Sequence, residues 1–312
     1  MNKTSIEWTD LTWNPIRANL KGPHAPRPHS GTFCTRISPG CTNCYASVIN
    51  RRFGNGLEYI VPNLERVEFF LDEKILAEPL QRKKPARIFV GDMFDLFHEA
   101  IPDDLIGEVF AVMEQCQQHT FQVLTKRAAR MRAILTEAAD TAPQRYRGLL
   151  PLPHVWLGVS VEDQKRADER VPEVLATPAA VRFLSVEPQL EAICLTRIPW
   201  KENVYRDALY GTEAVQWVIC GGESGPGARP FNLAWAESLL AQCHAAGVPF
   251  FCKQLGSQPY INRLAVFLDS DGMLDVEPGR MHLRDRKGGD PAEWPEALRV
   301  REFPATKIQV PA

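Results

Sequence analysis

Three cysteines stand close together near the start of the chain, and thiols at this spacing are candidate metal ligands. They are Cys34, Cys41 and Cys44, spaced as C-x6-C-x2-C in the stretch GTFCTRISPGCTNCYAS. Thiolate sulfur binds both zinc and the iron of iron–sulfur clusters. Eight cysteines in 312 residues are too few for a disulfide scaffold. We interpret these three as a metal site and the scattered other five as small buried hydrophobic residues.

The number of ligands distinguishes two kinds of metal centre. A structural zinc ion takes four ligands, and His24 and His29 on the preceding Pro-rich loop are the nearest candidates for a fourth. A Cys3His zinc site is therefore one interpretation. A [4Fe–4S] cluster held by only three thiolates is the other. It would leave one iron with an open position that can chelate a substrate or cofactor.

The secondary-structure elements that must position this loop follow one repeated pattern. In it, apolar runs alternate with segments of helical periodicity. The runs cover residues 87–95, 120–127, 154–163, 181–188, 215–225 and 248–256. They are nearly continuous in apolar residues, as is typical of parallel strands covered by helices. We expect an α/β fold with a partial or complete parallel (β/α) barrel over residues 1–256. The remaining residues, 257–312, are rich in Asp, Gly and Pro and predict a small irregular C-terminal extension or cap.

Composition and charge limit the partners and the cellular compartment that we expect. The chain carries 36 basic and 38 acidic residues, a net charge of -2, so no overall positive field favours a polyanion. No apolar stretch is long enough for a membrane span, and the N-terminus does not resemble a signal peptide. We therefore expect a protein of a reducing cytoplasm that does not contact membranes.

Polar residues gather at the carboxyl ends of the expected strands, which is where barrels and open α/β sheets bind their ligands. Several are cations, and these indicate an acidic or phosphorylated substrate. The alternative is that each cation is an ion-pair partner of a neighbouring carboxylate. The candidate substrate-binding residues are Lys126, Arg127, Glu223, Arg229 and Lys253.

Four motifs resemble a known group of proteins. They are SIEWTDLTWNP at 5–15, SPGCTNCYA at 38–46, GVSVED at 158–163 and GGESGPGARP at 221–230. Together with the three cysteines ahead of a parallel barrel, they resemble the radical S-adenosylmethionine (SAM) superfamily. More narrowly, they are similar to the phage-associated three-cysteine-motif proteins, a family of uncharacterised function. The resemblance extends over residues 5–256.

The resemblance implies a radical SAM enzyme with a barrel of the radical SAM type. Cys34, Cys41 and Cys44 would hold a [4Fe–4S] cluster, and the amino and carboxylate groups of SAM would bind its fourth iron. One-electron reduction would cleave SAM to methionine and a deoxyadenosyl radical that abstracts a substrate hydrogen. An electron donor such as flavodoxin or ferredoxin is implied, and a nucleotide or nucleic acid is the expected substrate class. The implied cofactor-binding residues are Tyr45, Gly91, Asp92, Ser160, Glu162 and Glu187.

The chain departs from the resemblance in two places. Six residues separate the first two cysteines, where the superfamily commonly has three. Residues 16–33 intervene between the WNP motif and the first cysteine, and we expect them to extend a loop over the site or to add a substrate contact. We expect Trp8 and Trp13 to pack against the barrel, and a base-stacking platform is the alternative.

Two other classes of function stay open. One is a zinc-containing nucleic-acid-binding protein without catalysis, which should show a concentrated basic face. The other is a [4Fe–4S] lyase that uses its open iron as a Lewis acid and has no need of a SAM pocket.

Overall fold

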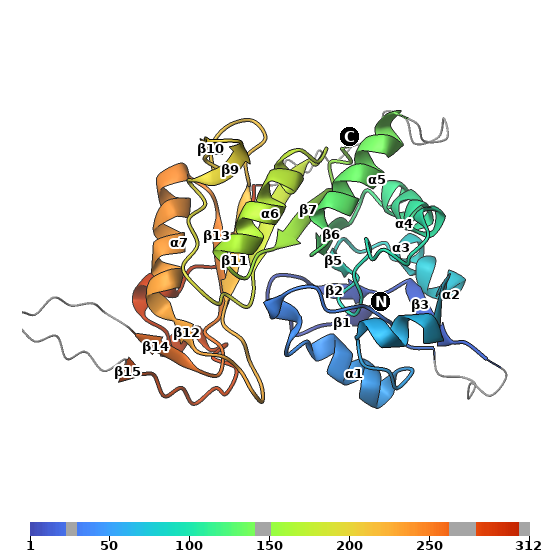
Figure 1. The fold of residues 1–312 in the computed structure, drawn as a ribbon, viewed down its shortest axis with the longest axis horizontal. Helices are drawn as coiled ribbons and strands as arrows, with labels where there is room; N and C mark the ends of the chain where they lie inside the picture. Colours follow the sequence, from blue (N-terminus) through green and yellow to red (C-terminus); the bar gives the residue numbers. More distant parts are fainter. Residues whose placement is uncertain (23–29, 141–150, 262–278, 306–312) are drawn as a thin grey trace, which may run out of the picture. The chain divides into compact units, whose positions relative to one another are not determined.

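The computed structural model describes residues 1–22, 30–140, 151–261 and 279–305 (Figure 1). Contacts within the chain group these residues into two compact units. Unit 1 comprises Met1–Ser160 and Glu173–Phe183, and unit 2 comprises Val161–Pro172 and the described residues from Leu184 onward. His24 and His29, the histidines considered for a zinc site, lie outside the described residues.

Unit 1 contains most of a parallel sheet. In order, its strands are β1 (Asn2–Lys3), β2 (Leu11–Trp13), β5 (Arg87–Val90), β6 (Thr120–Thr125) and β7 (Val155–Ser160), followed by β8 (Val181–Val186). β1 is antiparallel to β2, whereas β2, β5, β6 and β7 pair in parallel. Every residue of β7 is buried, as expected for a strand covered on both faces.

Helices connect the parallel strands of unit 1, because a parallel pair needs a long crossover. The longer ones are α4 (Asp103–Gln115), after β5, and α5 (Ala128–Asp140), after β6. The short helices α2 (Glu73–Leu76) and α3 (Glu78–Gln81) precede β5. The sequence predicted the two longer helices and the strands before them.

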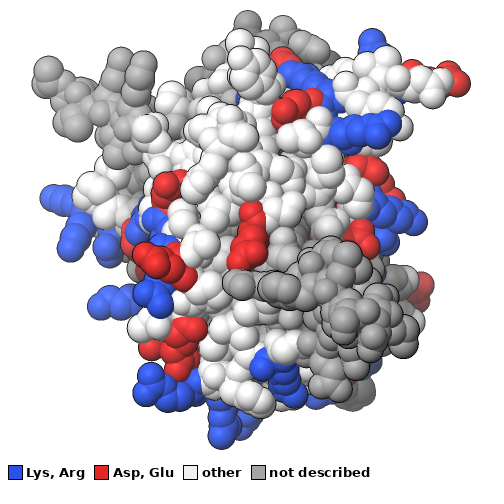
Figure 2. All heavy atoms as spheres, turned by 90° about the vertical axis from the view of Figure 1, so that its left-hand side faces the viewer, with Lys and Arg blue, Asp and Glu red and all other residues white. Residues whose placement is uncertain are grey.

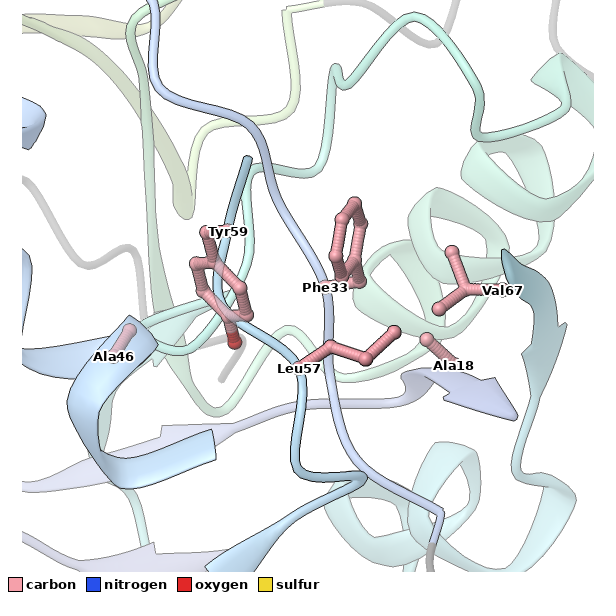
Figure 3. Packing of buried hydrophobic residues seen from close by; sticks show 6 residues of the cluster. All are labelled: Ala18, Phe33, Ala46, Leu57, Tyr59 and Val67. Carbon is pink, nitrogen blue, oxygen red and sulfur yellow. The ribbon is translucent and has the colours of Figure 1, made fainter. Parts of the chain in front are cut away.

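In unit 1, the cysteine loop packs against a small separate substructure. β3 (Ile16–Leu20) pairs antiparallel with β4 (Val67–Leu71), and α1 (Tyr45–Phe53) starts directly after the third cysteine. The 3-10 turns η1 (Pro39–Cys41) and η2 (Val61–Arg66) complete it. Figure 3 shows its buried core, formed by Ala18, Phe33, Ala46, Leu57, Tyr59 and Val67. Cys34 and Cys44 pack against this core.

The inserted residues 16–33 help to build this substructure. β3 lies within them, and Ala18 makes a further antiparallel bridge to Gly31. The buried Asn50 accepts from the backbone N–H of Thr32 at 3.1 Å and donates to Asn55 at 2.7 Å. The described part of the insertion therefore supports the cysteine loop. The expected loop over the site or substrate contact stays a prediction, because residues 23–29 lie outside the described residues.

Unit 2 continues the sheet beyond β8. β11 (Trp217–Gly221) and β13 (Phe250–Gln254) pair in parallel, and α7 (Leu233–Ala246) connects them. α7 ends at Gly247, whose φ of 66° is the left-handed conformation common at helix C-termini. α6 (Gln164–Leu175) begins in unit 2. Short strands complete the unit: β9 (Ile198–Lys201), β10 (Val204–Arg206), β12 (Phe231–Asn232), β14 (Pro259–Ile261) and β15 (Gly279–Arg280).

The described part of the C-terminal segment packs within unit 2. It contains the 3-10 turns η3 (Pro291–Glu293) and η4 (Glu296–Leu298). The backbone N–H of Cys252 on β13 donates to Val300 O at 2.8 Å, and the Trp217 indole donates to Glu302 O at 2.9 Å. These bonds fasten residues after 256 to β11 and β13.

The fold is thus a mixed α/β fold with an eight-stranded, mostly parallel sheet, in the order β1-β2-β5-β6-β7-β8-β11-β13. The expected α/β class with a parallel sheet is confirmed. Trp8 packs on Phe89 with ring centroids 4.7 Å apart, and Trp13 is fully buried and donates to Ile75 O at 2.8 Å. The packing interpretation of both tryptophans is confirmed, and a base-stacking platform is wrong because neither ring reaches solvent.

Two surface observations concern partners. No helix among the described residues is long and apolar enough to cross a membrane. On the face drawn in Figure 2, Lys and Arg side chains alternate with Asp and Glu around a middle that carries few charges. Where described residues form that face, it shows no concentrated basic patch of the kind expected for a nucleic-acid-binding module.

Candidate functional site

The three cysteines of the loop differ in how the backbone holds them. Cys34 follows the buried Phe33, Cys41 ends the turn η1, and Cys44 immediately precedes α1. Pro39 favours this turn, because its fixed φ suits the first position of a helical turn. The Cys41 N–H donates to Ser38 O at 2.9 Å. All three thiols are unpaired by disulfides and half-buried. One loop therefore presents three free thiols over the substructure described above.

Electrostatics at the thiols combine burial with nearby positive charge. Burial raises the pKa of Cys34 to about 12, although the Arg127 guanidinium acts to lower it. Burial also raises the pKa of Cys44, opposed by the backbone N–H groups of Ser47 and Ala46 at the start of α1. Cys44 nevertheless makes no side-chain capping hydrogen bond of standard geometry. Cys41 and Cys44 contribute to raising the pKa of Cys34, and Cys41 contributes to raising the pKa of Cys44, so the three sulfurs are electrostatic neighbours.

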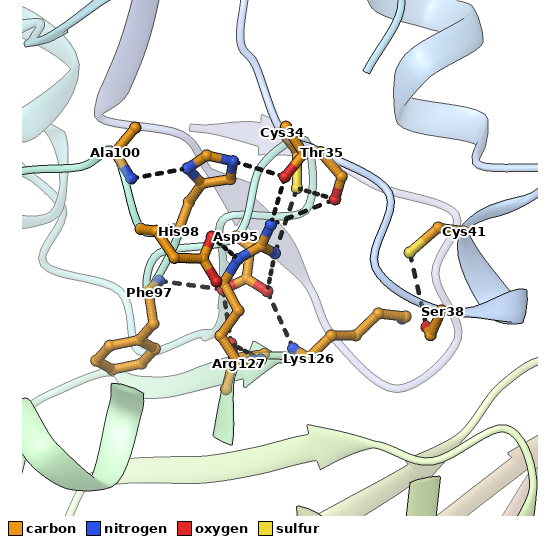
Figure 4. A network of polar contacts seen from close by, with 12 residues as sticks. Cys34, Thr35, Ser38, Cys41, Asp95, Phe97, His98, Ala100, Lys126 and Arg127 are labelled. Atoms are coloured by element: carbon orange, nitrogen blue, oxygen red, sulfur yellow. Dashed lines mark hydrogen bonds and ion pairs between the residues drawn. The ribbon is translucent and has the colours of Figure 1, made fainter. Parts of the chain in front are cut away.

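Arg127, directly after β6, has a buried guanidinium whose five N–H donors all find acceptors (Figure 4). Nε donates to Glu99 at 2.7 Å, and one terminal nitrogen donates to Asp95 at 3.1 Å and to the Cys34 sulfur at 3.6 Å. The other terminal nitrogen donates to Thr35 Oγ1 at 2.9 Å and to Thr35 O at 3.3 Å. Burial lowers the pKa of Arg127, but the surrounding anions, Asp95 first, raise it overall. The side chain is therefore a fixed cation beside the first cysteine.

Asp95 is the anion that balances this cation. Its two oxygens accept from the Thr125 hydroxyl at 2.6 Å and from the backbone N–H groups of Phe97 and Lys126, each at 3.0 Å. Burial alone would raise the pKa of Asp95, but Arg127 and these donors hold it below its usual range. Asp95 thereby ties the loop after β5 to the end of β6.

A second polar group lies at the end of β5. Asn14 donates to the Asp92 carboxylate at 2.7 Å, and the Tyr45 hydroxyl donates to the Asp92 backbone carbonyl at 2.7 Å. Burial raises the pKa of Asp92 above its ordinary value. Gly91 has a φ of 78°, which favours glycine and lets the chain turn there. The Tyr45 bond links the first residue of α1, next to Cys44, to Asp92.

Four of the five candidate residues of unit 2 form two ion pairs with one another. Lys253 Nζ lies 3.0 Å from Glu187 Oε1, and Ser185 donates to the other oxygen at 3.3 Å. Arg229 donates to both oxygens of Glu223, at 2.9 and 2.7 Å. These two pairs lie at the carboxyl ends of β8, β11 and β13.

Glu162 and Ser160 are both buried near the end of β7. Glu162 has no exposed surface, and Arg170 donates to its carboxylate at 2.9 Å. A cofactor contact by Glu162 would therefore require this buried pair to open. Ser160 is the last residue of β7 and belongs to unit 1.

Comparison with known proteins places the chain in a family. Residues 3–265 match the family described as "Protein of unknown function (DUF5131)". The chain belongs to this family. The match covers the three cysteines and all the candidate residues, and it agrees with the resemblance to a family of uncharacterised function. No curated protein and no solved structure matches the chain.

Within this DUF5131 chain, the predicted site residues fall into two groups. Unit 1 holds the three cysteines with Tyr45, Gly91, Asp92, Lys126, Arg127 and Ser160. Unit 2 holds Glu162, Glu187, Glu223, Arg229 and Lys253. The alternative interpretation of the candidate cations, that each is the ion-pair partner of a carboxylate, holds for Arg127, Arg229 and Lys253. For Lys126, the described part of the chain contains no ion pair, and its charge lowers the pKa of Cys44.

Sequence reasoning assigned no specific role to four residues that build the unit 1 site: Asn14, Thr35, Asp95 and His98. Asp95 was recognised only as one of the polar residues at the carboxyl ends of the expected strands, because it ends the motif VGDMFD. Asn14 stands in the WNP motif, but its partner Asp92 is 78 residues away along the chain. His98 lies in a loop with no flanking pattern that would indicate its contacts.

The donor chemistry of the loop fits an iron–sulfur cluster. Three thiols share one half-buried loop, and a guanidinium N–H points at the Cys34 sulfur, as donors around cluster sulfurs do. Among the described residues, no three Cys, His, Asp or Glu side chains are gathered to hold one metal ion.

Proposed function

We propose that this chain is a radical SAM enzyme in which Cys34, Cys41 and Cys44 hold a [4Fe–4S] cluster. The observation that carries the proposal is the set of three free thiols on one loop, with the Arg127 guanidinium directed at the first sulfur. The mostly parallel eight-stranded sheet supports a barrel of the radical SAM type. When bound, the cluster would supply one electron to SAM, whose cleavage starts radical chemistry on the substrate.

The chain's own residues would bind and orient the cofactors. Three thiolates from one loop leave one iron open for the amino and carboxylate groups of SAM. Asp92 is the candidate acceptor for the SAM amino group, because its carboxylate is held by Asn14 at the end of β5. The Tyr45 hydroxyl fixes the Asp92 backbone carbonyl, which keeps that turn beside α1. Burial around Asp92 would limit the access of water during the reaction.

We infer an acidic substrate, with a nucleotide or nucleic acid as the class to test first. Lys126 supports this inference, because its charge acts on the cysteine loop and it has no ion pair among the described residues. The motif resemblance to phage-associated proteins supports nucleic-acid modification as the setting. The chemistry also needs an electron donor, for which we propose flavodoxin or ferredoxin.

The proposal is tested by cluster content in single cysteine variants. We expect anaerobic reconstitution of the wild type to incorporate about four iron and four sulfide ions per chain. Cys34→Ala, Cys41→Ala and Cys44→Ala should each lose most of both, because each removes one of only three protein ligands. Their far-ultraviolet circular dichroism should stay at the wild-type level, since the loop lies outside the parallel sheet.

The matched control is Cys194→Ala, which removes an exposed thiol in unit 2. It should retain the wild-type iron and sulfide content. One equivalent of zinc without sulfide in the wild type would contradict the proposal and favour a zinc-binding protein. Equal cluster content in all four variants would contradict the assignment of the ligands.

A further inference from the structure

Arg127 makes more contacts than charge balance requires. Asp95 and Glu99 are two carboxylates for one guanidinium, so they already neutralise it. The remaining three N–H donors all reach the cysteine loop, at the Cys34 sulfur and at two oxygens of Thr35. Burying an arginine is costly unless its donors are satisfied, and here that satisfaction depends on the cysteine loop.

The contacts of Arg127 fasten the loop to the sheet. The Arg127 backbone N–H donates to the Thr125 hydroxyl at 2.9 Å, and that hydroxyl donates to Asp95. The guanidinium is thereby fixed relative to β6 on one side. On the other side it holds both the side chain and the carbonyl of Thr35, the neighbour of Cys34 (Figure 4). Arg127 thus fixes the position of the Cys34 sulfur relative to β6.

Building on the proposed function, we propose that Arg127 is a positioning residue for the cluster, which fixes Cys34 and raises the reduction potential through its N–H···S hydrogen bond. Reduction adds negative charge to the cluster and its sulfurs. A hydrogen bond and a fixed positive charge at one sulfur stabilise the reduced form relative to the oxidised form. A merely structural arginine would support the fold and leave the potential unchanged.

Two substitutions separate these roles. Arg127→Gln removes the charge and most of the donors, whereas Arg127→Lys keeps the charge and loses the planar fork. Arg130→Gln is the matched control, because Arg130 lies three residues further on, in helix α5, and among the described residues its hydrogen bonds go to Ile101 O and Asp103 and not to the cysteine loop. The readouts are iron per chain, circular dichroism and the fraction of reduced cluster at a fixed ambient potential.

We expect Arg127→Gln to lower the ratio of reduced to oxidised cluster about tenfold, which corresponds to about 59 mV for one electron. Arg127→Lys should fall between this variant and the wild type. Arg130→Gln should match the wild type in both potential and iron content. A folded Arg127→Gln chain that loses iron while Arg130→Gln keeps it would support the positioning of Cys34.

A wild-type ratio of reduced to oxidised cluster in a folded, cluster-loaded Arg127→Gln chain would overturn the inference and leave the proposed function standing. If Arg127→Gln does not fold, Arg127→Lys decides, and a wild-type potential there overturns the inference. A wild-type chain that assembles no cluster overturns the proposed function and, with it, this inference.

Discussion

His98 is a buried histidine that its surroundings keep neutral. The backbone N–H of Ala100 donates to its Nδ1 at 3.1 Å, so the neutral ring carries its proton on Nε2, which lies 3.0 Å from Thr35 Oγ1. Burial, with Arg127 as the next cause, lowers the pKa of His98 to about 4. Protonation would also break the bond from Ala100. His98 therefore links the loop after β5 to the cysteine loop through Nε2, and it keeps its bond from Ala100 only in its neutral form.

This residue makes the stability of the metal-free chain depend on pH. The folded pKa of about 4 lies below the unfolded value near 6.5, so the unfolded chain binds the proton first as the pH falls. The contribution is present above pH 6.5 and is lost towards pH 4. From pH 7 to pH 5, the wild type should lose about 2 kcal/mol more stability than His98→Asn. Chemical denaturation of both proteins at the two pH values measures this. Parallel losses would show that His98 is protonated equally in both states.

At the scale of elements, β7 and β8 pack closely against each other. A Cβ added at Gly158 on β7 would lie 2.5 Å from the ring of Phe183, which is fully buried on β8. Such overlap forces a side chain off its rotamer or shifts the backbone. We expect Gly158→Ala to lower the free energy of unfolding by roughly 2 kcal/mol, measured by chemical denaturation.

Gly107 in α4 provides the comparison for this prediction. Apart from its chain neighbours and the backbone of its own helix, no atom of the described residues lies within 4 Å of a Cβ built there, and its backbone is helical. Gly107→Ala should therefore raise the free energy of unfolding by up to about 1 kcal/mol, because alanine favours the helix. A wild-type stability for Gly158→Ala would mean that the β7–β8 packing differs from the one described.

The sequence predicted the elements whose signals are local. β5, β6, β7, α4 and α5 appear where apolar runs and helical periodicity predicted them. It did not predict the pairing of β3 with β4, because residues some 50 positions apart in sequence must meet and the apolar residues of β4 do not alternate with polar ones. α1 was also missed: it is short, and apolar side chains such as Val48 and Phe53 lie on its exposed face.

The candidate site was predictable to the same extent. The cysteines were found from their spacing, and Asp92 and Arg127 from their position at strand ends. The network that joins them depends on contacts such as Arg127 to Cys34, across 93 residues of sequence. Periodicity carries no information about such pairs, so Thr35 and His98 were not identified.

At the scale of the whole molecule, charge is balanced and the described chain forms two compact units. The groups that bear on the cluster proposal, from the cysteine loop to Asp92 and Arg127, all belong to unit 1. The two candidate cations of unit 2, Arg229 and Lys253, are already paired with carboxylates. The account therefore depends most on whether the loop of unit 1 holds a cluster that SAM can bind.

The most direct measurement is electron paramagnetic resonance of the anaerobically reconstituted, reduced chain, recorded with and without SAM. We expect a reduced [4Fe–4S] signal that changes when SAM is added, because only three protein thiolates leave one iron open to the cofactor. A [4Fe–4S] signal that SAM leaves unchanged would contradict the SAM proposal and favour a Lewis-acid lyase. Stoichiometric zinc with no cluster signal would contradict the iron–sulfur site itself.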